Sequence, residues 1–255
     1  MLTADRLAEL VLAWYAEHGR DLPWRRTRDP YAILVSEVML QQTQVERVIE
    51  RWTAWLERWP TAADLAAASR ADVIAAWQGL GYNRRAVALH EAARLLAENG
   101  IPRDQAGWRA LPGVGPYTAA AVCALALDHD VVPLDVNVQR ILERALGATS
   151  IEPPAGKGHD LTQALFDLGA TLCLARIPRC DACPLAEACP SRGRRYEPQR
   201  KQSRFEGSRR QARGQLLDRL REAPVALDDC DAAIAASLIA DGLAEQHDGL
   251  LSLPS

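Results

Sequence analysis

The chain has 255 residues, enough for one large domain or two smaller ones, and its 48% hydrophobic and 25% charged residues are typical of a soluble globular protein. No apolar run reaches membrane-spanning length, and the N-terminal segment lacks the basic start and cleavage site of a signal peptide. We therefore expect a cytoplasmic protein with reduced thiols. The formal net charge of −3 does not by itself favour nucleic-acid binding.

Apolar residues recur at spacings of three and four along most of the chain, which predicts helices. Prolines and glycines separate these stretches, and convincing strand patterns are absent before the C-terminal tail. The order predicts an all-α core of short helices. The helical stretches are 7–18, 37–59, 61–69, 71–80, 84–100, 118–128, 135–147 and 160–176.

One carboxyl group lies inside an apolar part of this pattern, in "SEVMLQQTQV". Glu37 stands among Leu34, Val38 and Met39 on a helix that we expect to be largely buried. A buried carboxyl without a charged partner has a raised pKa, which suits a general acid. For this residue alone, a structural role is the competing interpretation.

The segment "LPGVGPYTAAA" (111–121) places two glycines between helices. Gly113 and Gly115 permit a tight turn and the close approach of another backbone. Pro116 suits the first turn of the following helix, whose free N–H groups can hold a phosphate. We interpret this segment as a hairpin that binds a DNA backbone without reading sequence; a plain helix–helix turn is the alternative.

The segment "VVPLDVNVQR" brings a second carboxyl group to the start of a helix. Asp135 has the position of an N-cap, the commonest role for such an aspartate. It lies about twenty residues after the hairpin, so it can instead stand beside a bound phosphate, oriented by Asn137. Together with Glu37 it would form a carboxylate pair with separable roles.

Four of the six cysteines fall in one short segment, with the spacing C-x6-C-x2-C-x5-C. They are Cys173, Cys180, Cys183 and Cys189. Four thiolates from one loop suit a [4Fe–4S] cluster or a zinc ion. Zinc modules usually carry two C-x2-C pairs, and this segment has only one, so we favour the cluster.

The segment 191–214 holds nine basic and two acidic residues, so it is either a phosphate-binding strip or a solvated linker.

A different unit begins near residue 208. We expect a helix over 208–224, a helix, a turn and a second helix over 226–242, and two strands around the turn Asp248-Gly249. Helices followed by a hairpin indicate a small winged-helix-like unit.

These motifs identify a resemblance that covers roughly residues 5–215. The chain resembles the helix-hairpin-helix DNA glycosylases of the endonuclease III superfamily, and most closely the MutY-type adenine DNA glycosylases. The resemblance rests on "DLPWRRTRDPY", "SEVMLQQTQV", "GLGYNRRA", "LPGVGPYTA", "LDVNVQR" and the four-cysteine loop. Among these, "LPWR" and "EVMLQQT" point to the adenine branch.

The resemblance implies a reaction on a base that has been extruded from double-stranded DNA, because the glycosidic bond is inaccessible in the stack. Glu37 would protonate N7 of a mispaired adenine, and Asp135, kept ionised, would stabilise the oxocarbenium-like sugar. Tyr117 and Asn137 would position these groups. Gln42 and Tyr82 would fill and wedge the DNA duplex near the target base. The other residues expected to contact DNA are Arg25, Thr43, Gly113, Gly115, Arg176 and Arg179.

The residue at position 117 separates two reaction types. Members that also cut the strand carry a lysine there, which forms a Schiff base. This chain has tyrosine, and its only lysines, Lys157 and Lys201, lie outside the motifs. We therefore expect a monofunctional glycosylase.

The resemblance also implies a domain plan, with a structural [4Fe–4S] cluster on the four cysteines. A six-helix domain would span 25–130, a cluster domain 1–24 and 131–200, and the winged-helix-like unit 201–255. The partner would be double-stranded DNA bound by a monomer, associated with the nucleoid and without a membrane.

Two departures leave alternatives open. Asn83 stands where a second tyrosine is usual, and the last fifty residues are too few for the Nudix-like domain by which many adenine glycosylases recognise 8-oxoguanine. Tyr117 also occurs in related thymine/uracil mismatch glycosylases, which are the second candidate. A cluster-bearing DNA-binding module without activity is disfavoured because both acids are present.

Overall fold

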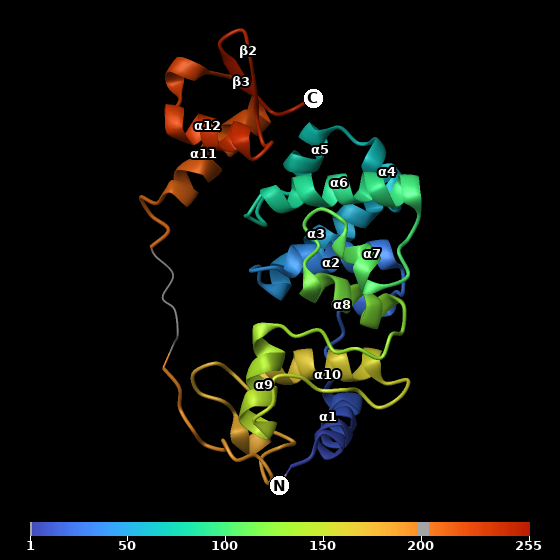
Figure 1. Ribbon diagram of the computed structural model, residues 1–255. Coiled ribbons are helices and arrows are strands. Elements are labelled where there is room, and N and C mark those ends of the chain that lie inside the picture. Colours follow the sequence, from blue (N-terminus) through green and yellow to red (C-terminus); the bar gives the residue numbers. More distant parts are fainter. Residues whose placement is uncertain (1, 198–203) are drawn as a thin grey trace. The chain divides into compact units, whose positions relative to one another are not determined.

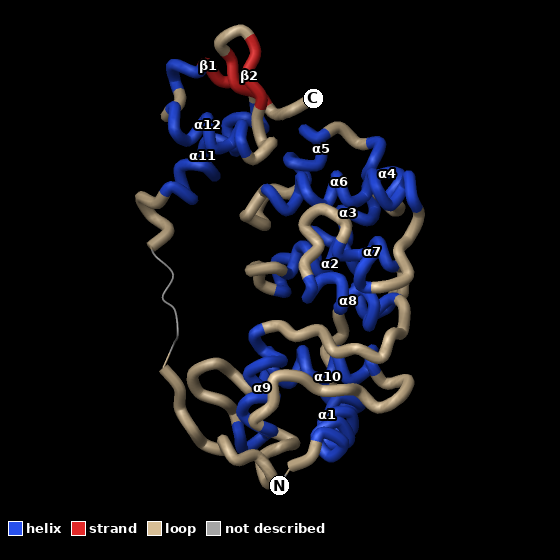
Figure 2. The backbone as a smooth tube through the Cα atoms, in the orientation of Figure 1, coloured by secondary structure: helices blue, strands red, loops and turns tan. Residues whose placement is uncertain are grey.

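The structure is a computed structural model that describes residues 2–197 and 204–255. Its elements are predominantly helical, and the strands of the described part belong to one small sheet near the C-terminus (Figure 2). The chain divides into two compact units. The first unit is Met1–Glu37, Pro102–Ala110 and Val114–Lys201, and the second is Val38–Ile101, Leu111–Gly113 and Gln202–Ser255.

The first unit packs α1 and α9 against α10 around a core of aliphatic side chains (Figure 1). Helix α2 is apolar on every side, and each residue from 31 to 39 is buried, as expected for a central helix. The unit's elements are α1 (Ala4–His18), η1 (Pro23–Arg26), α2 (Pro30–Leu40, up to Glu37), α7 (Gln105–Arg109), α8 (Pro116–Ala126), α9 (Val136–Leu146), α10 (Gly158–Thr171) and η2 (Cys180–Ala182).

A buried ion pair ties the N-terminal segment of the first unit to α10. The carboxylate of Asp167 is fully buried and accepts two hydrogen bonds from the guanidinium of Arg25, at 2.7 and 2.8 Å. The backbone N–H and Nε of Arg20 donate to the same carboxylate. Burial alone raises the pKa of Asp167, but these donors lower it overall. Removing one member of such a pair leaves a buried charge uncompensated, so the pair enforces this arrangement.

The second unit packs α4 against α6, and α5 and α6 against the C-terminal helices. Ile74 and Val87 enter one hydrophobic cluster with Leu217 of α11 and Leu238 of α12. The unit's elements are α3 (Val45–Arg58), α4 (Ala62–Ala67), α5 (Arg70–Ala76), α6 (Arg84–Asn99), α11 (Arg209–Glu222), β1 (Val225–Ala226), η3 (Leu227–Asp229), α12 (Ala232–Ala240), β2 (Glu245–His247) and β3 (Leu250–Ser252).

The winged-helix-like unit is present. The strands form an antiparallel sheet in the order β1-β3-β2, and the predicted hairpin turn is confirmed because Asp248 and Gly249 both have positive φ, 48° and 77°. Between residues 226 and 242 only one α-helix forms, capped by Asp231, and the expected first helix is the short η3. The short strand β1 was not predicted.

The helix expected over 37–59 is two helices. Helix α2 ends at Leu40 and α3 begins at Val45, with Gln42 in the left-handed backbone region at φ 57°. The compact units also differ from the expected domain plan, since α2 up to Glu37, α7 and α8 fall in the first unit and α3–α6 in the second. That plan stays a prediction. No helix among the described residues is long and apolar enough to cross a membrane.

Candidate active site and nucleic-acid contacts

The carboxyl group of Glu37 is buried in the first unit and has one hydrogen-bond donor beside it. The Tyr117 hydroxyl donates to Glu37 Oε2 at 2.9 Å, and Glu37 is 4% exposed. Burial raises the pKa of Glu37 to about 7; the Tyr117 hydrogen bond and Arg25 oppose this rise, and the negative charge of Asp135 adds to it. Glu37 is therefore a carboxyl that can hold a proton near neutral pH, as a general acid must.

Local geometry at α8 explains the position of Tyr117. Gly115 is the N-cap and Pro116 occupies the first helical position, so Tyr117 lies in the first turn. Its ring is tilted against Phe166 of α10 at 6.3 Å between centroids. Burial and the nearby Glu37 and Asp135 raise the pKa of Tyr117 well above its ordinary value, so the hydroxyl stays a donor.

Asp135 is the N-cap of α9 and accepts hydrogen bonds from three nitrogen atoms. Its Oδ1 accepts from the backbone N–H groups of Asn137 and Val138 at 2.9 and 2.7 Å, and its Oδ2 accepts from Asn137 Nδ2 at 2.7 Å. These donors and the positive end of the helix dipole interact favourably with the carboxylate. The two acids of the first unit thus have different environments: Glu37 is buried beside one hydroxyl donor, whereas Asp135 accepts three N–H hydrogen bonds at a helix N-terminus.

The orientation of Asn137 is set by a second layer of contacts. Arg140 Nη2 donates to Asn137 Oδ1 at 2.8 Å and to the carbonyl of Gly169 at 3.0 Å, while its Nε donates to the carbonyl of Cys173 at 2.8 Å. A side chain at Gly169 would come within 2.7 Å of Asn137 Cβ, so glycine permits this approach of α9 and α10. A continuous hydrogen-bonded chain therefore joins Asp135 to the cysteine loop.

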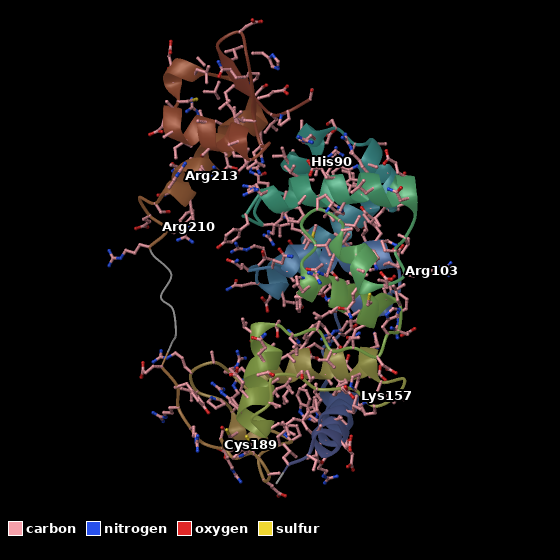
Figure 3. All side chains as sticks on the ribbon, viewed as in Figure 1. His90, Arg103, Lys157, Cys189, Arg210 and Arg213 are labelled. Atoms are coloured by element: carbon pink, nitrogen blue, oxygen red, sulfur yellow. The ribbon has the colours of Figure 1, made fainter. Side chains whose placement is uncertain are left out.

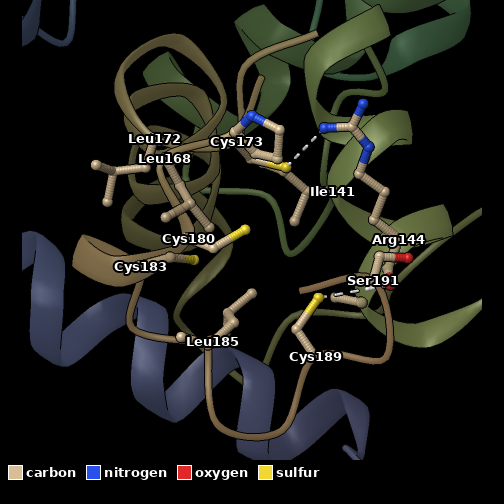
Figure 4. A pocket seen from close by; sticks show the side chains of 13 residues that line it. Ile141, Arg144, Leu168, Leu172, Cys173, Cys180, Cys183, Leu185, Cys189 and Ser191 are labelled. Carbon is tan, nitrogen blue, oxygen red and sulfur yellow. Dashed lines mark hydrogen bonds between the residues drawn. The ribbon is translucent and has the colours of Figure 1, made fainter. Parts of the chain in front are cut away.

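All four cysteines of the loop line one cavity of the first unit, and their sulfur atoms point toward a common space (Figure 4). Arg144 Nη1 lies 3.6 Å from Cys173 Sγ, and its guanidinium stacks on Tyr196 at 3.7 Å. Burial is the main cause that raises the pKa of Cys183 to about 11, and the other three thiols add to it. Among residues 2–197 and 204–255, no group of three or more His, Cys, Asp or Glu converges on a single metal ion.

Four of the predicted DNA contacts belong to the second unit: Gln42, Thr43, Tyr82 and Gly113. Gln42 and Tyr82 line one broad groove of this unit, and both have positive φ, 57° and 46°. Tyr82 is 46% exposed. The Thr43 hydroxyl is turned inward, donating to the carbonyl of Leu80 at 3.3 Å, so its assignment to DNA stays a prediction.

The predicted hairpin is formed by residues between α7 and α8. Gly113 has φ 74°, and a side chain there would come within 2.8 Å of Ala88 Cβ, so this position requires glycine. Gly115 has extended backbone and open space around it. The α8 N-terminus at Gly115 has no side-chain cap hydrogen bond, and the positive end of its helix dipole suits a ligand such as a phosphate.

The remaining predicted contacts differ in exposure. Arg176 and Arg179 are exposed on the cysteine loop. The Arg25 side chain is only 11% exposed because Asp167 holds it, so its described role is structural and its assignment to DNA stays a prediction. Lys157 lies at the start of α10 (Figure 3), and Lys201 is outside the described residues, as is part of the basic segment.

Three arginines that hold these sites together were not predicted as functional residues from the sequence. Arg85, Arg140 and Arg144 donate mainly to backbone carbonyls of other segments. Two of them stand inside motifs already singled out, "GLGYNRRA" and "LDVNVQR". Their position in these motifs was the available signal, but only the fold shows which carbonyls they reach.

Comparison with known proteins agrees with this geometry. A family model described as "HhH-GPD superfamily base excision DNA repair protein" matches residues 35–162. The chain belongs to this family. The HhH-GPD match contains Glu37, Tyr117, Asp135 and the hairpin.

The HhH-GPD protein has curated relatives named adenine DNA glycosylase. It is 41% identical to that of Mycolicibacterium smegmatis over 95% of this chain and 94% of the relative. It is also 41% identical to that of Homo sapiens, over 72% of this chain but 39% of the relative. Among solved structures, a thermostable thymine-DNA glycosylase matches with TM-score 0.68 at 28% identity, over 73% of this chain and 95% of that one. A trapped endonuclease III–DNA covalent intermediate matches at TM-score 0.64 and 23% identity, covering 74% of this chain and 97% of that one, which supports the fold.

The buried Glu37 makes stability depend on pH in a predictable direction. Its folded-state pKa of about 7 lies above the ordinary value of 4.5, so the folded state binds the extra proton between these values. The stabilisation is complete below about pH 4.5 and is lost as pH rises to about 7. Replacing Glu37 by Gln removes this dependence. As pH rises across that range, the free energy of unfolding of wild type should therefore fall by about 3 kcal/mol relative to that of the variant.

Urea unfolding of wild type and Glu37→Gln at several pH values between 4 and 8 measures this difference. Glu17→Gln, at an exposed position of α1, is the matched control, and its free energy of unfolding should vary with pH as that of wild type does. If the free energy of unfolding of Glu37→Gln also varies with pH as in wild type, Glu37 titrates normally.

Proposed function

We propose that this base excision repair protein is a monofunctional DNA glycosylase that hydrolyses the N-glycosidic bond of adenine mispaired with 8-oxoguanine or guanine. The observation that carries the proposal is the buried Glu37 carboxyl, bonded by the Tyr117 hydroxyl, in the same unit as the Asp135 carboxyl. Adenine leaves well only when a ring nitrogen is protonated, so an acid of this kind serves a purine. The identity of 41% to a curated adenine DNA glycosylase over 95% of the chain supports the same substrate.

In this proposal the two acids act at different atoms of one nucleotide. Glu37 gives its proton to N7 of the extruded adenine, and the Tyr117 hydroxyl, as a hydrogen-bond donor, holds the carboxylate that forms. Asp135, fixed by Asn137, stabilises the positive charge on the sugar, and water completes hydrolysis. Tyr117 has no amine to attack C1′, so the strand stays uncut.

Double-stranded DNA is the proposed partner, bound by a monomer, with association to the nucleoid in the cytoplasm. The hairpin at Gly113 and the α8 N-terminus each suit a phosphate, and the exposed Arg176 and Arg179 suit the backbone. These contacts carry no sequence information. They fit an enzyme that must scan any duplex for one kind of mispair.

Thymine/uracil mismatch glycosylase is the second candidate, supported by the 28% identity to a thymine-DNA glycosylase structure. Pyrimidines leave as anions and need the Glu37 proton less, which weakens this candidate.

We infer that the four cysteines hold a [4Fe–4S] cluster. They fit it because the four thiols line one cavity of the first unit, and four thiolates are the ligand set of such a cluster. When bound, the cluster supplies a covalent cross-link for the loop that carries Arg176 and Arg179. The base chemistry is left to Glu37 and Asp135.

Single-turnover excision on A:8-oxoG, A:G, T:G and U:G duplexes tests the substrate. We expect adenine opposite 8-oxoguanine to leave fastest. Asp135→Asn and Glu37→Gln should each slow excision by about 100-fold or more while DNA affinity stays near wild type, because both groups act in the transition state. Borohydride should trap no covalent complex. Faster release of thymine or uracil would move the assignment to the second candidate.

Metal content tests the cluster. Protein purified without oxygen should be yellow-brown and contain about four irons per chain, as four-thiolate ligation of this cluster requires. Cys180→Ala should lose most of the iron, whereas Cys123→Ala, at a buried position of α8, should keep it. Stoichiometric zinc in place of iron would contradict the proposal.

The C-terminal helix α11 lines the same groove of the second unit as Gln42 and Tyr82. Arg210 and Arg213 face this groove from α11 (Figure 3), and Arg213 is held by Asp241. We therefore propose that the tail contributes to recognition of the base opposite adenine. Deleting the tail would uncover Ile74 and Val87, so point variants test this better.

Arg210→Ala should weaken DNA binding, reduce the salt dependence by about one counterion, and lower the preference for 8-oxoguanine over guanine. Arg219→Ala is the control, because Arg219 lies on α11 outside the groove, with its guanidinium on the carbonyl of Asp229. Comparison of equilibrium binding at several salt concentrations with single-turnover rates on A:8-oxoG and A:G measures both effects. If Arg210→Ala and Arg219→Ala show the same preference for 8-oxoguanine over guanine, the proposed role of the tail is wrong and the proposed enzyme class still stands.

A further inference from the structure

Two residues of the second unit hold an unusual backbone conformation for their type. In the described part of the chain, four non-glycine residues have positive φ: Gln42, Tyr82, Asp128 and Asp248. Aspartate tolerates the left-handed region through its short polar side chain, whereas glutamine and tyrosine rarely adopt it. The two atypical residues are the ones assigned to fill and wedge the duplex. Such strain persists only where surrounding contacts enforce it.

One guanidinium supplies contacts on both sides of this pair. Arg85 Nη1 donates to the carbonyl of Gln41 at 2.6 Å, and Arg85 Nη2 donates to the carbonyl of Gly81 at 3.0 Å. These carbonyls belong to the residues directly before Gln42 and Tyr82. Nη2 also donates to the carbonyl of Leu80 at 3.0 Å and to Thr43 Oγ1 at 3.2 Å, so both loops are bonded by the same planar group.

Arg85 also terminates helix α2. Its Nη1 lies 2.7 Å from the carbonyl of Val38 and 3.1 Å from that of Met39, two of the last carbonyls of the helix. A cation there satisfies acceptors that have no partner within the helix and is favoured by the helix dipole. This accounts for the end of α2 at Leu40, where apolar periodicity predicts a longer helix.

The surroundings of Arg85 are aromatic and contain no acid among its described contacts. The guanidinium lies 5.3 Å from the Trp77 ring centroid and 5.6 Å from that of Tyr82, so it also touches the wedge side chain. Burial lowers the pKa of Arg85 to about 10, and the group is still charged near neutral pH. A lysine could keep the charge but not the fork that spans two loops.

We infer that Arg85 is a positioning residue that holds Gln42 and Tyr82 together in their left-handed conformation, ready for insertion into DNA. The inference rests on the proposed function, because it takes Gln42 and Tyr82 as the residues that enter the duplex. Preorganisation of this kind lowers the conformational cost of extruding the base, since the loops need not be ordered when DNA binds. Arg85 touches neither the base nor the sugar in this scheme.

Arg85→Lys tests the inference against Arg84→Lys, its neighbour on α6, which is 74% exposed and whose described ion pair is with Asp241. The first experiment needs no DNA. Amide hydrogen exchange of the free protein should quicken in 41–43 and 79–83 together in Arg85→Lys, while 86–96 of α6 keeps its protection. Arg84→Lys should leave all three segments unchanged. Faster exchange throughout the second unit would mean a general structural role and would overturn the inference.

The second experiment follows base extrusion with 2-aminopurine at the target position. Arg85→Lys should reduce the fluorescence rise on bound DNA and slow single-turnover excision by about 10- to 100-fold, with DNA affinity and its salt dependence near wild type. Adding Gln42→Asn, which suits the left-handed region better and keeps an amide, should recover part of the rate. If Arg85→Lys gives the same rise in 2-aminopurine fluorescence as wild type, the inference is wrong.

The two experiments separate failure of this inference from failure of the proposed function. If wild type extrudes no base but the exchange result is as expected, Arg85 organises the loops and the glycosylase proposal is wrong. If wild type extrudes and excises adenine while loop exchange in Arg85→Lys is unchanged, the enzyme stands and Arg85 has no positioning role.

Discussion

The candidate chemistry depends on the removal of water from one carboxyl group. Helix α2 is buried on every side, and the price of placing Glu37 there is that its charged form is disfavoured. A single neutral donor, the Tyr117 hydroxyl, satisfies the group without supplying the positive charge that would lower its pKa again. An arginine at that distance would lock the carboxylate in the ionised form. The choice of partner therefore decides whether Glu37 can donate a proton.

Asp135 shows the opposite solution within the same unit. Its carboxylate accepts backbone and amide hydrogen bonds at a helix N-terminus, and the Arg140 guanidinium interacts with it only at longer range, since it donates to Asn137. A cation at this position would compete with the positive charge that develops on the sugar. Fixed neutral dipoles stabilise the carboxylate and leave its charge available to the reaction.

The sequence was sufficient for most of the helices and for the burial of Glu37, and insufficient for the contacts that orient the candidate site. Apolar periodicity predicted a buried Glu37, and a capping position predicted the Asp135 interactions. Periodicity could not predict the break at Gln42, because it depends on Arg85, more than forty residues away, reaching the end of α2. Likewise, the sequence did not indicate that Arg25 pairs with the buried Asp167 of α10, because long-range pairing of this kind leaves no local signal.

The arginines of this chain thus divide by what surrounds them. Arg25 pairs with a buried carboxylate, Arg85 and Arg140 bond backbone carbonyls, and Arg176 and Arg179 are exposed. A guanidinium offers five donors in a rigid plane, so one side chain can join segments that have no sequence proximity. The same residue type serves phosphate binding only where it is exposed. A count of basic residues along the sequence therefore overestimates the surface available to DNA, because several arginines hold loops, or the Asn137 side chain beside Asp135, in place.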